Sequence, residues 1–555
     1  MGSQRHRLLT VLLAVLLLAA ACGSGDDSGG DESSGTADAA SSDGDAAPTT
    51  AAAQDLAAED SEAADFAVAE EAMEDDSGVD AGEASEAAGG LFDEAVAVEE
   101  ERDAEDDNRF VDYGVRPFVP TDVDPLSTFA LDVDTASYSI ARGWVDGGAV
   151  PPIESVRLEE YVNSFSYDYR SPADGLAVSA DAGPSPFTEG NVVVRLGVQA
   201  EQVANADRPD ATLTFVIDTS GSMDRSNRLE LVKASLSRLV NELEPRDQIA
   251  IVTYSDGADV LLAPTSVEES DVILDAIDSL ATTGSTNLEA GLQRGYDLAD
   301  QAYVDGGINR VILASDGVAN VGLTDPDGLA QLIRDDADRG IQLVTVGVGM
   351  GNFSDVTMEQ LADQGDGFYA YVDTPAEADR LFADDLVSTL LTVAIDGKIQ
   401  VEFDPSTVAE YRLLGYENRA VLDDDFRNDA VDAGELGAGH QATALYELVL
   451  ADGVGAGDPL GTAQLRWEDP DTGSVVETRL ELAGSVLESS WLDTSTDFRL
   501  AVTVASLAEI LRDSPHRGDI TLEQVRAEAG ALEDEIGGGE TAELWQLIDD
   551  IIALS

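Results

Sequence analysis

The segment 209–393 alternates short apolar runs with amphipathic stretches, and this pattern constrains the fold more than any other feature of the chain. Most of the runs are almost continuously apolar, which is typical of strands covered on both faces. Such alternation predicts a parallel sheet between two helix layers. The predicted strands are 212–217, 248–254, 259–262, 310–314, 342–348 and 368–372, the third forming an antiparallel edge hairpin, and the predicted helices are 227–242, 268–280, 287–303, 327–339, 356–364 and 375–392.

Polar side chains with oxygen donors stand at three strand or helix boundaries of this segment. Asp218, Ser220 and Ser222 alternate in the run Asp-Thr-Ser-Gly-Ser-Met, directly after the first apolar run. Thr286 precedes a predicted helix, and Asp316 follows a predicted strand. Ligands of such open sheets bind beyond the carboxyl ends of the strands, so we expect the three loops to meet at one edge. Carboxylate and hydroxyl oxygens suit Mg²⁺, Mn²⁺ or Ca²⁺.

These three pieces resemble the metal-ion-dependent adhesion site of the von Willebrand factor type A (VWA) domain. The resemblance implies that Ser220, Ser222 and Thr286 ligate a divalent cation directly, with Mg²⁺ preferred to Mn²⁺ or Ca²⁺. It implies that Asp218 and Asp316 ligate the cation directly or through water. Because Mg²⁺ usually keeps several waters, an acidic side chain of a partner protein could displace one of them. The alternative is a degenerate VWA domain that keeps these residues without binding metal.

The resemblance extends over about residues 120–555, to a bacterial family of VWA lipoproteins, the YfbK-like proteins. It is carried by the stretch 127–170, by Gly-Tyr-Glu-Asn-Arg at 415–419, by Gly-Ala-Gly-His at 437–440 and by Asp-Phe-Arg-Leu at 497–500. Several runs on both sides of the VWA segment tend to alternate apolar and polar residues, which predicts half-buried antiparallel strands. These runs are 176–181, 191–199, 398–403, 409–414, 443–450, 461–467 and 474–482.

The predicted fold class is therefore α/β: a doubly wound, mostly parallel, Rossmann-like VWA sheet inserted in one β-sandwich, with a small C-terminal helical unit and a disordered N-terminal tether. The helices outside the VWA segment are expected at 156–165, 498–511, 522–536 and 541–552. The expected organisation is a signal peptide at 1–22, an acidic linker at 23–108, an N-terminal flanking segment of helix and strands at 109–208, the VWA domain at 209–393, a β-sandwich segment at 394–490 and a helical segment at 491–555.

The first 22 residues are typical of a bacterial export signal. Two arginines and a histidine precede the apolar run 8–18, which is too short to span a bilayer comfortably. Three alanines before Cys22 resemble a lipobox, although a lipobox usually has Leu at the position of Ala19. Cys22 is the only cysteine, and a diacylglyceryl group on it would supply two-chain anchoring. We predict an extracytoplasmic protein held on the bacterial cell membrane by this lipid anchor alone. The alternative is a plain secretory signal cleaved after Ala21.

The segment 23–108 is dominated by Ala, Gly, Ser, Asp and Glu, and no Lys or Arg occurs between Arg7 and Arg102. Such a chain cannot bury enough apolar surface to offset its ordering entropy, and its charges repel one another. This composition predicts a disordered, extended spacer, with an acidic binding tail as the alternative. The whole chain has a formal net charge of −81, which argues against a nucleic-acid partner and against direct binding to anionic lipid.

The VWA segment contains no histidine that could serve as the general base of a hydrolytic enzyme. Hydrolytic metal sites usually pair the ion with a general base, whereas the three histidines, His6, His440 and His516, lie outside the VWA segment. We therefore predict that the protein is not an enzyme and that His440 makes a loop hydrogen bond. Asp132 and Asp134 begin a near-copy of the Asp-x-Ser-x-Ser spacing that is one residue too long, and we expect a structural strand and turn there.

The predicted function is the binding of an extracytoplasmic protein that supplies an acidic side chain to the metal. One alternative is a channel-associated or hydrolytic protein, because some VWA relatives carry a chloride-channel-type label, although no pore-forming segment is found in the sequence. The other alternative is a structural envelope protein with a vestigial metal site.

Overall fold

The computed structural model describes residues 110–131, 133–316, 328–329, 333–334, 337, 339–349 and 355–555. The expected signal peptide with Cys22, the acidic linker, Asp132 and most of the expected helix 327–339 lie outside these residues. None of the described helices is long and apolar enough to cross a membrane.

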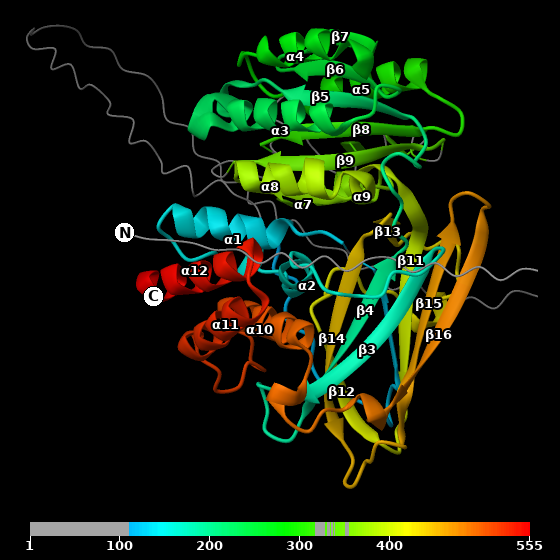
Figure 1. Ribbon diagram of the computed structural model, residues 1–555, viewed down its shortest axis with the longest axis vertical. Helices are drawn as coiled ribbons and strands as arrows, with labels where there is room; N and C mark the ends of the chain where they lie inside the picture. Colours follow the sequence, from blue (N-terminus) through cyan, green and yellow to red (C-terminus); the bar gives the residue numbers. More distant parts are fainter. Residues whose placement is uncertain are drawn as a thin grey trace, which may run out of the picture. The chain divides into compact units, whose positions relative to one another are not determined.

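A six-stranded sheet with the order β10-β9-β8-β5-β6-β7 lies at the centre of the VWA segment (Figure 1). Neighbouring strands are parallel, except that β7 runs antiparallel to β6 at the edge. Every residue of β5 and β8 is buried, as their apolar sequences predict. The predicted sheet and edge hairpin are confirmed by β5 (Ala211–Asp218), β6 (Gln248–Tyr254), β7 (Ala258–Ser266), β8 (Ile308–Ser315), β9 (Ile341–Val348) and β10 (Tyr369–Val372).

Helices cover both faces of this sheet. One apolar core joins the strands to α3 (Arg228–Glu242) and α4 (Ser270–Asp278), and the other joins them to α5 (Leu288–Ala302) and α7 (Asp355–Asp363). The helix expected at 375–392 is instead divided into three pieces, which are α8 (Pro375–Asp379), a π-helical turn (Arg380–Asp384) and α9 (Leu386–Leu390).

Strands from before and after the VWA segment form one β-sandwich, as predicted (Figure 1). β4 pairs with β14, and β2 pairs with β11, so each sheet contains both flanks of the chain. Side chains from both sheets share one apolar core. The first sheet is β1 (Val119–Pro120), β12 (Val408–Leu414), β14 (Gln441–Leu450), β4 (Val192–Ala200) and β3 (Leu176–Pro184), and the second is β13 (Gly434–Gly437), β11 (Thr392–Phe403), β15 (Pro459–Asp469) and β16 (Ser474–Ala483), with β2 (Leu126–Ala130) beside β11.

β11 begins six residues earlier than the run 398–403 indicates. Its pairing register shifts between Ile395 and Lys398, where Asp396 has a φ of 55°. A bulge of this kind adds a residue to one strand, and so the apolar and polar residues cease to alternate there. The alternation therefore predicts only the part of β11 beyond the bulge.

The C-terminal helices α10 (Thr496–Leu511), α11 (Leu522–Ile536) and α12 (Gly539–Leu554) form the predicted helical unit. Their core also contains side chains of α2 (Leu158–Asn163), which is shorter than the expected helix 156–165, and of α1 (Ala136–Asp146). The sequence did not predict α1, which contains Ser and Gly and has little intrinsic helix propensity. Its apolar residues divide between this core and one face of the VWA sheet, so tertiary packing stabilises the helix.

Candidate metal centre

The five residues expected to bind metal lie on three loops at one edge of the VWA sheet. Asp218 is the last residue of β5, and Asp316 directly follows β8, which pairs with β5 in parallel. Thr286 lies two residues before α5. Backbone hydrogen bonds join the loops, because Gly221 N donates to Gly284 O at 3.1 Å and Thr283 N donates to Thr219 O at 2.5 Å.

The two carboxylates of this edge are almost fully buried, at 0% and 1% exposure for Asp218 and Asp316. Asp218 Oδ1 accepts a hydrogen bond from Ser220 N at 2.8 Å, and Asp218 Oδ2 accepts one from Ser315 Oγ at 3.0 Å. Asp316 Oδ2 accepts from Arg228 Nη1 at 2.6 Å, in an ion pair. The other oxygen of Asp316, Oδ1, is buried without a hydrogen-bond partner among the described residues.

Ser220 and Ser222 directly follow the carboxylate of Asp218, and Thr286 lies in the neighbouring loop that Gly284 joins to Gly221. Ser220 Oγ and Ser222 Oγ lie 2.9 Å apart, in hydrogen-bond contact. Ser220 and Thr286 are buried, and Ser222 is half-buried. Ser222 is part of a 3₁₀ turn (Gly221–Asn227) that leads into α3. The loops therefore place the hydroxyls of Ser220 and Ser222 next to each other, directly after the carboxylate that ends β5.

Two buried carboxylates at one edge repel each other. Burial and the nearby charge of Asp316 raise the pKa of Asp218 to about 6, although Ser220 and Ser315 oppose the shift by hydrogen bonding. Burial also raises the pKa of Asp316, against the attraction of the Arg228 guanidinium. Arg228 is the arginine that forms an ion pair here, and the exposed Arg225 adds a weaker attraction, so the buried carboxylates are only partly balanced.

Arg228, Ser315 and Tyr254 also contact the two carboxylates, and the sequence pattern does not indicate them. Tyr254, at the end of β6, donates to Asp218 Oδ2 at 3.4 Å, and burial raises its pKa far above the ordinary value. Arg228 crosses the end of β9, where a Cβ on Gly349 would lie 2.1 Å from Arg228 Nε. One signal in the sequence could have indicated Arg228. A buried aspartate needs a cationic or hydrogen-bonding partner, and Arg228 is the first residue of the helix that follows the Asp-Thr-Ser-Gly-Ser-Met run.

Asp134 and His440 make structural contacts away from this edge. Asp134 Oδ1 accepts from Tyr369 N at 2.9 Å, and its Oδ2 accepts from Arg419 Nη2 at 2.9 Å. His440 Nδ1 accepts from Gly437 N at 3.0 Å, and burial lowers its pKa to about 4. His440 therefore makes a hydrogen bond within its loop, as expected. Asp134 joins the start of β10 to Arg419.

Three family models match the chain. The model of the von Willebrand factor type A domain matches residues 212–384, and a model described as von Willebrand factor matches residues 104–195. A model described as the C-terminal part of the uncharacterized protein YfbK matches residues 388–458 and 453–554.

Individual proteins are also similar to the chain. It is 35% identical over 469 residues to the uncharacterized protein YfbK of Escherichia coli, with 80% of each chain covered. It is 24% identical over 260 residues to human inter-alpha-trypsin inhibitor heavy chain H3, with 42% of this chain and 28% of that protein covered. A solved structure, von Willebrand factor type A from Catenulispora acidiphila, has a TM-score of 0.39 at 18% identity and covers 69% of this chain and 91% of that chain.

The burial of the Asp218 charge predicts how stability depends on pH without metal. In EDTA at pH 7.5, Asp218→Asn should melt at the same temperature as the wild type or a few degrees higher. An amide removes the buried charge, and the hydroxyl of Ser315 can reverse its hydrogen bond. Because the folded-state pKa of Asp218 is raised to about 6, the wild type gains stability as the pH falls through 6, and the difference should shrink at pH 5. Scanning calorimetry at both pH values measures this, and a clear loss of stability in the variant at pH 7.5 would contradict it.

Proposed function

The chain belongs to the family of YfbK-like von Willebrand factor type A proteins, and from this we propose that it is a binding protein whose VWA domain docks a protein partner through a divalent cation. Proteins with VWA domains commonly mediate protein interactions, and their adhesion sites often bind a divalent metal. In this chain, we propose that the cation is held by Asp218, Ser220, Ser222, Thr286 and Asp316.

The observation that carries this proposal is the unsatisfied oxygen of Asp316. A buried oxygen without a hydrogen bond is costly, and Asp316 Oδ1 is such an atom beside a second buried carboxylate. A cation at this edge would satisfy that oxygen and neutralise the excess charge. The set of two carboxylates and three hydroxyls contains hard oxygens alone, which suits Mg²⁺, Mn²⁺ or Ca²⁺ rather than a softer metal.

A bound Mg²⁺ would supply an open coordination position for a partner. The hydroxyls of Ser220, Ser222 and Thr286 would hold the ion, and Asp218 and Asp316 would balance its charge. The hydroxyls are neutral and the ion keeps some water, so a Glu or Asp carboxylate of the partner can replace a water. In this proposal the protein recognises an acidic side chain on the surface of another extracytoplasmic protein.

We propose binding without catalysis. Among the described residues, the side chains that hydrogen-bond to Asp218 or Asp316 are those of Arg228 and Tyr254 and of the serines Ser220, Ser222 and Ser315. None of these is a base at neutral pH, since burial raises the pKa of Tyr254 even further. A general base next to the metal is what a hydrolytic mechanism would need.

The location proposed for the protein follows from its N-terminal sequence. Lipidation of Cys22 would anchor the chain, and the acidic segment 23–108 would let the VWA domain reach a partner at a distance from the membrane.

Mg²⁺ binding should depend on the two carboxylates. Asp218→Asn and Asp316→Asn should each weaken Mg²⁺ binding about tenfold or more, measured by isothermal titration calorimetry on the full chain. Asp224→Asn is the matched control, since Asp224 is an exposed carboxylate in the same loop. Equal affinities in all four proteins would mean that the metal does not bind at this edge.

Partner binding should need both the metal and Asp218. We expect proteins from the cell envelope to bind the immobilised wild type and Asp224→Asn in Mg²⁺. The same proteins should be lost in EDTA, and they should be lost with Asp218→Asn even in Mg²⁺. Quantitative mass spectrometry of the eluates measures this. If Asp218→Asn recovers the same proteins as the wild type, the metal site is vestigial and the proposed mechanism is wrong.

Anchoring should depend on Cys22. In a bacterial host, Cys22→Ser should move the protein from the membrane fraction to the soluble fraction, provided that mass spectrometry shows its signal sequence has been removed. A processed Cys22→Ser protein that stays with the membrane would overturn the lipid-anchor proposal.

A further inference from the structure

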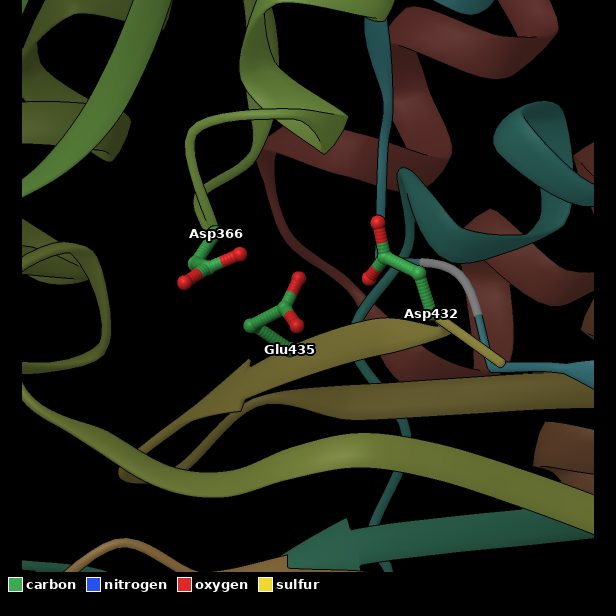
Figure 2. Close-up of side chains that lie close together, drawn as sticks. All are labelled: Asp366, Asp432 and Glu435. Atoms are coloured by element: carbon green, nitrogen blue, oxygen red, sulfur yellow. The ribbon is translucent and has the colours of Figure 1, made fainter. Parts of the chain in front are cut away.

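A second group of acidic side chains lies where the VWA segment meets the β-sandwich (Figure 2). Asp366 is in the turn that enters β10, and Asp432 and Glu435 flank the start of β13. One carboxylate oxygen from each residue lies within 4.8 Å of the others. Asp366 precedes its strand, whereas Asp218 ends a strand of the same parallel sheet, so this acidic triad is at the opposite edge from the candidate adhesion site.

Glu435 is the buried member of the acidic triad. It is 8% exposed, and its Oε1 is buried without a hydrogen-bond partner among the described residues. Figure 2 shows its carboxylate directed between the carboxylates of Asp366 and Asp432. Burying a carboxylate oxygen without a partner costs free energy unless a hydrogen bond or a cation compensates for it.

Arg310 is a buried arginine that is attracted electrostatically to Glu435 but does not form an ion pair with it. Arg310 donates from Nε to Leu390 O at 2.9 Å and from Nη2 to Thr392 Oγ1 at 2.8 Å. No ion pair joins Arg310 to Glu435 among the described residues, and Arg310 Nη1 is itself buried there without a hydrogen-bond partner. The guanidinium instead holds the chain where α9 passes into β11.

The segment that carries Asp432 is fixed before any ion binds. Lys398, which is 2% exposed, donates from Nζ to Asn428 O at 3.0 Å and also to Val431 O. Ala433 N donates to Asp396 Oδ1 at 2.9 Å. These contacts hold the 428–433 segment against β11, so Asp432 needs little ordering to reach a ligand.

The turn that carries Asp366 is also tightly held. Gly365 N and Gly367 N both donate to Ala362 O at 3.1 Å, and Leu343 N donates to Gly365 O at 2.8 Å. A Cβ on Gly367 would lie 1.8 Å from Leu343 O, so the turn closes against β9 without room for a side chain. Asp366 is therefore presented to β13 by a rigid turn.

Full ionisation of the acidic triad would leave negative charges that repel one another. Burial, with the charges of Asp366 and other nearby acids, raises the pKa of Glu435 well above its ordinary value and that of Asp432 to about 7. Of the nearest further acids, Asp363 is paired with Arg419 Nη1 at 2.8 Å and Asp396 accepts from Ala433 N. Protons or one cation could relieve this repulsion, and the triad has the composition of a cation site.

We propose that Asp366, Asp432 and Glu435 bind a Ca²⁺ ion that joins the VWA domain to the β-sandwich. Ca²⁺ accepts carboxylates in irregular geometry at 2.3–2.6 Å and so tolerates ligands from two separate segments. Mg²⁺ demands near-ideal octahedral geometry and gives up its waters reluctantly, which fits carboxylates from two separate segments less well. The ion would fix the orientation of the two domains, because its ligands come from both.

The test is calcium titration of the full chain by isothermal titration calorimetry, with Asp218→Asn as the parent so that binding at the Asp218 edge is weakened. We expect saturable binding of one Ca²⁺, at least about tenfold tighter than Mg²⁺. Adding Glu435→Gln or Asp432→Asn should each weaken Ca²⁺ binding about tenfold or more. Adding Asp452→Asn is the matched control, since Asp452 is an exposed carboxylate in the β14–β15 turn, and it should leave the affinity unchanged.

Thermal melting distinguishes a loss of Ca²⁺ binding from misfolding of the variants. Ca²⁺ should raise the melting temperature of the parent and of the Asp452→Asn control, and raise it far less in the two triad variants. In EDTA, Glu435→Gln should melt no lower than the parent, because it removes a buried charge. Absence of saturable Ca²⁺ binding in the parent, or unchanged affinity in folded Glu435→Gln and Asp432→Asn, overturns the proposal and leaves the triad a proton-binding cluster. Neither result depends on whether the Asp218 edge binds Mg²⁺.

Discussion

The burial of Asp218 and Asp316 beside a single paired guanidinium is the constraint on which the functional account depends. Both carboxylates end up buried because they terminate neighbouring central strands, and the loops that follow are hydrogen-bonded to each other. The ion pair with Arg228 balances the charge of Asp316 and satisfies one of its two carboxylate oxygens. What remains is a negative, oxygen-lined edge that a divalent cation would neutralise, and the same cation would offer a position to a carboxylate from another protein.

The β-sandwich fixes both ends of the VWA segment that carries this site. β4 and β14, as well as β2 and β11, pair across the inserted VWA segment, so the insertion starts and ends on one scaffold. The chain leaves the VWA segment through α9 and passes directly into β11, where Arg310 of β8 binds the connecting backbone. The Ca²⁺ ion proposed at the acidic triad would add a second link at this junction. In this arrangement one edge of the VWA sheet would be available to the proposed partner, and the opposite edge meets the β-sandwich.

The sequence predicts the VWA sheet well because its central strands are buried on both faces and read as uninterrupted apolar runs. It also predicts that the five candidate metal ligands stand at element boundaries, as they do in the structure, whereas their binding of metal stays a prediction. It does not predict β11 before its bulge, where alternation is lost, or α1, which packing stabilises. Nor does it predict Arg228 or the acidic triad. Asp366 and Glu435 are 69 positions apart, and only the folded chain shows that they meet, because nothing local distinguishes them from the many acidic residues of this chain.

The most direct measurement of the central claim is anomalous X-ray scattering from crystals of the protein grown with Mn²⁺, an ion that suits the same oxygen ligands. The account predicts an anomalous peak at coordination distance from the oxygens of Ser220, Ser222 and Thr286, close to Asp218 and Asp316, and predicts its loss in Asp218→Asn. The lack of a peak at this edge, or a peak there that persists in Asp218→Asn, would contradict the claim that this edge is the metal centre.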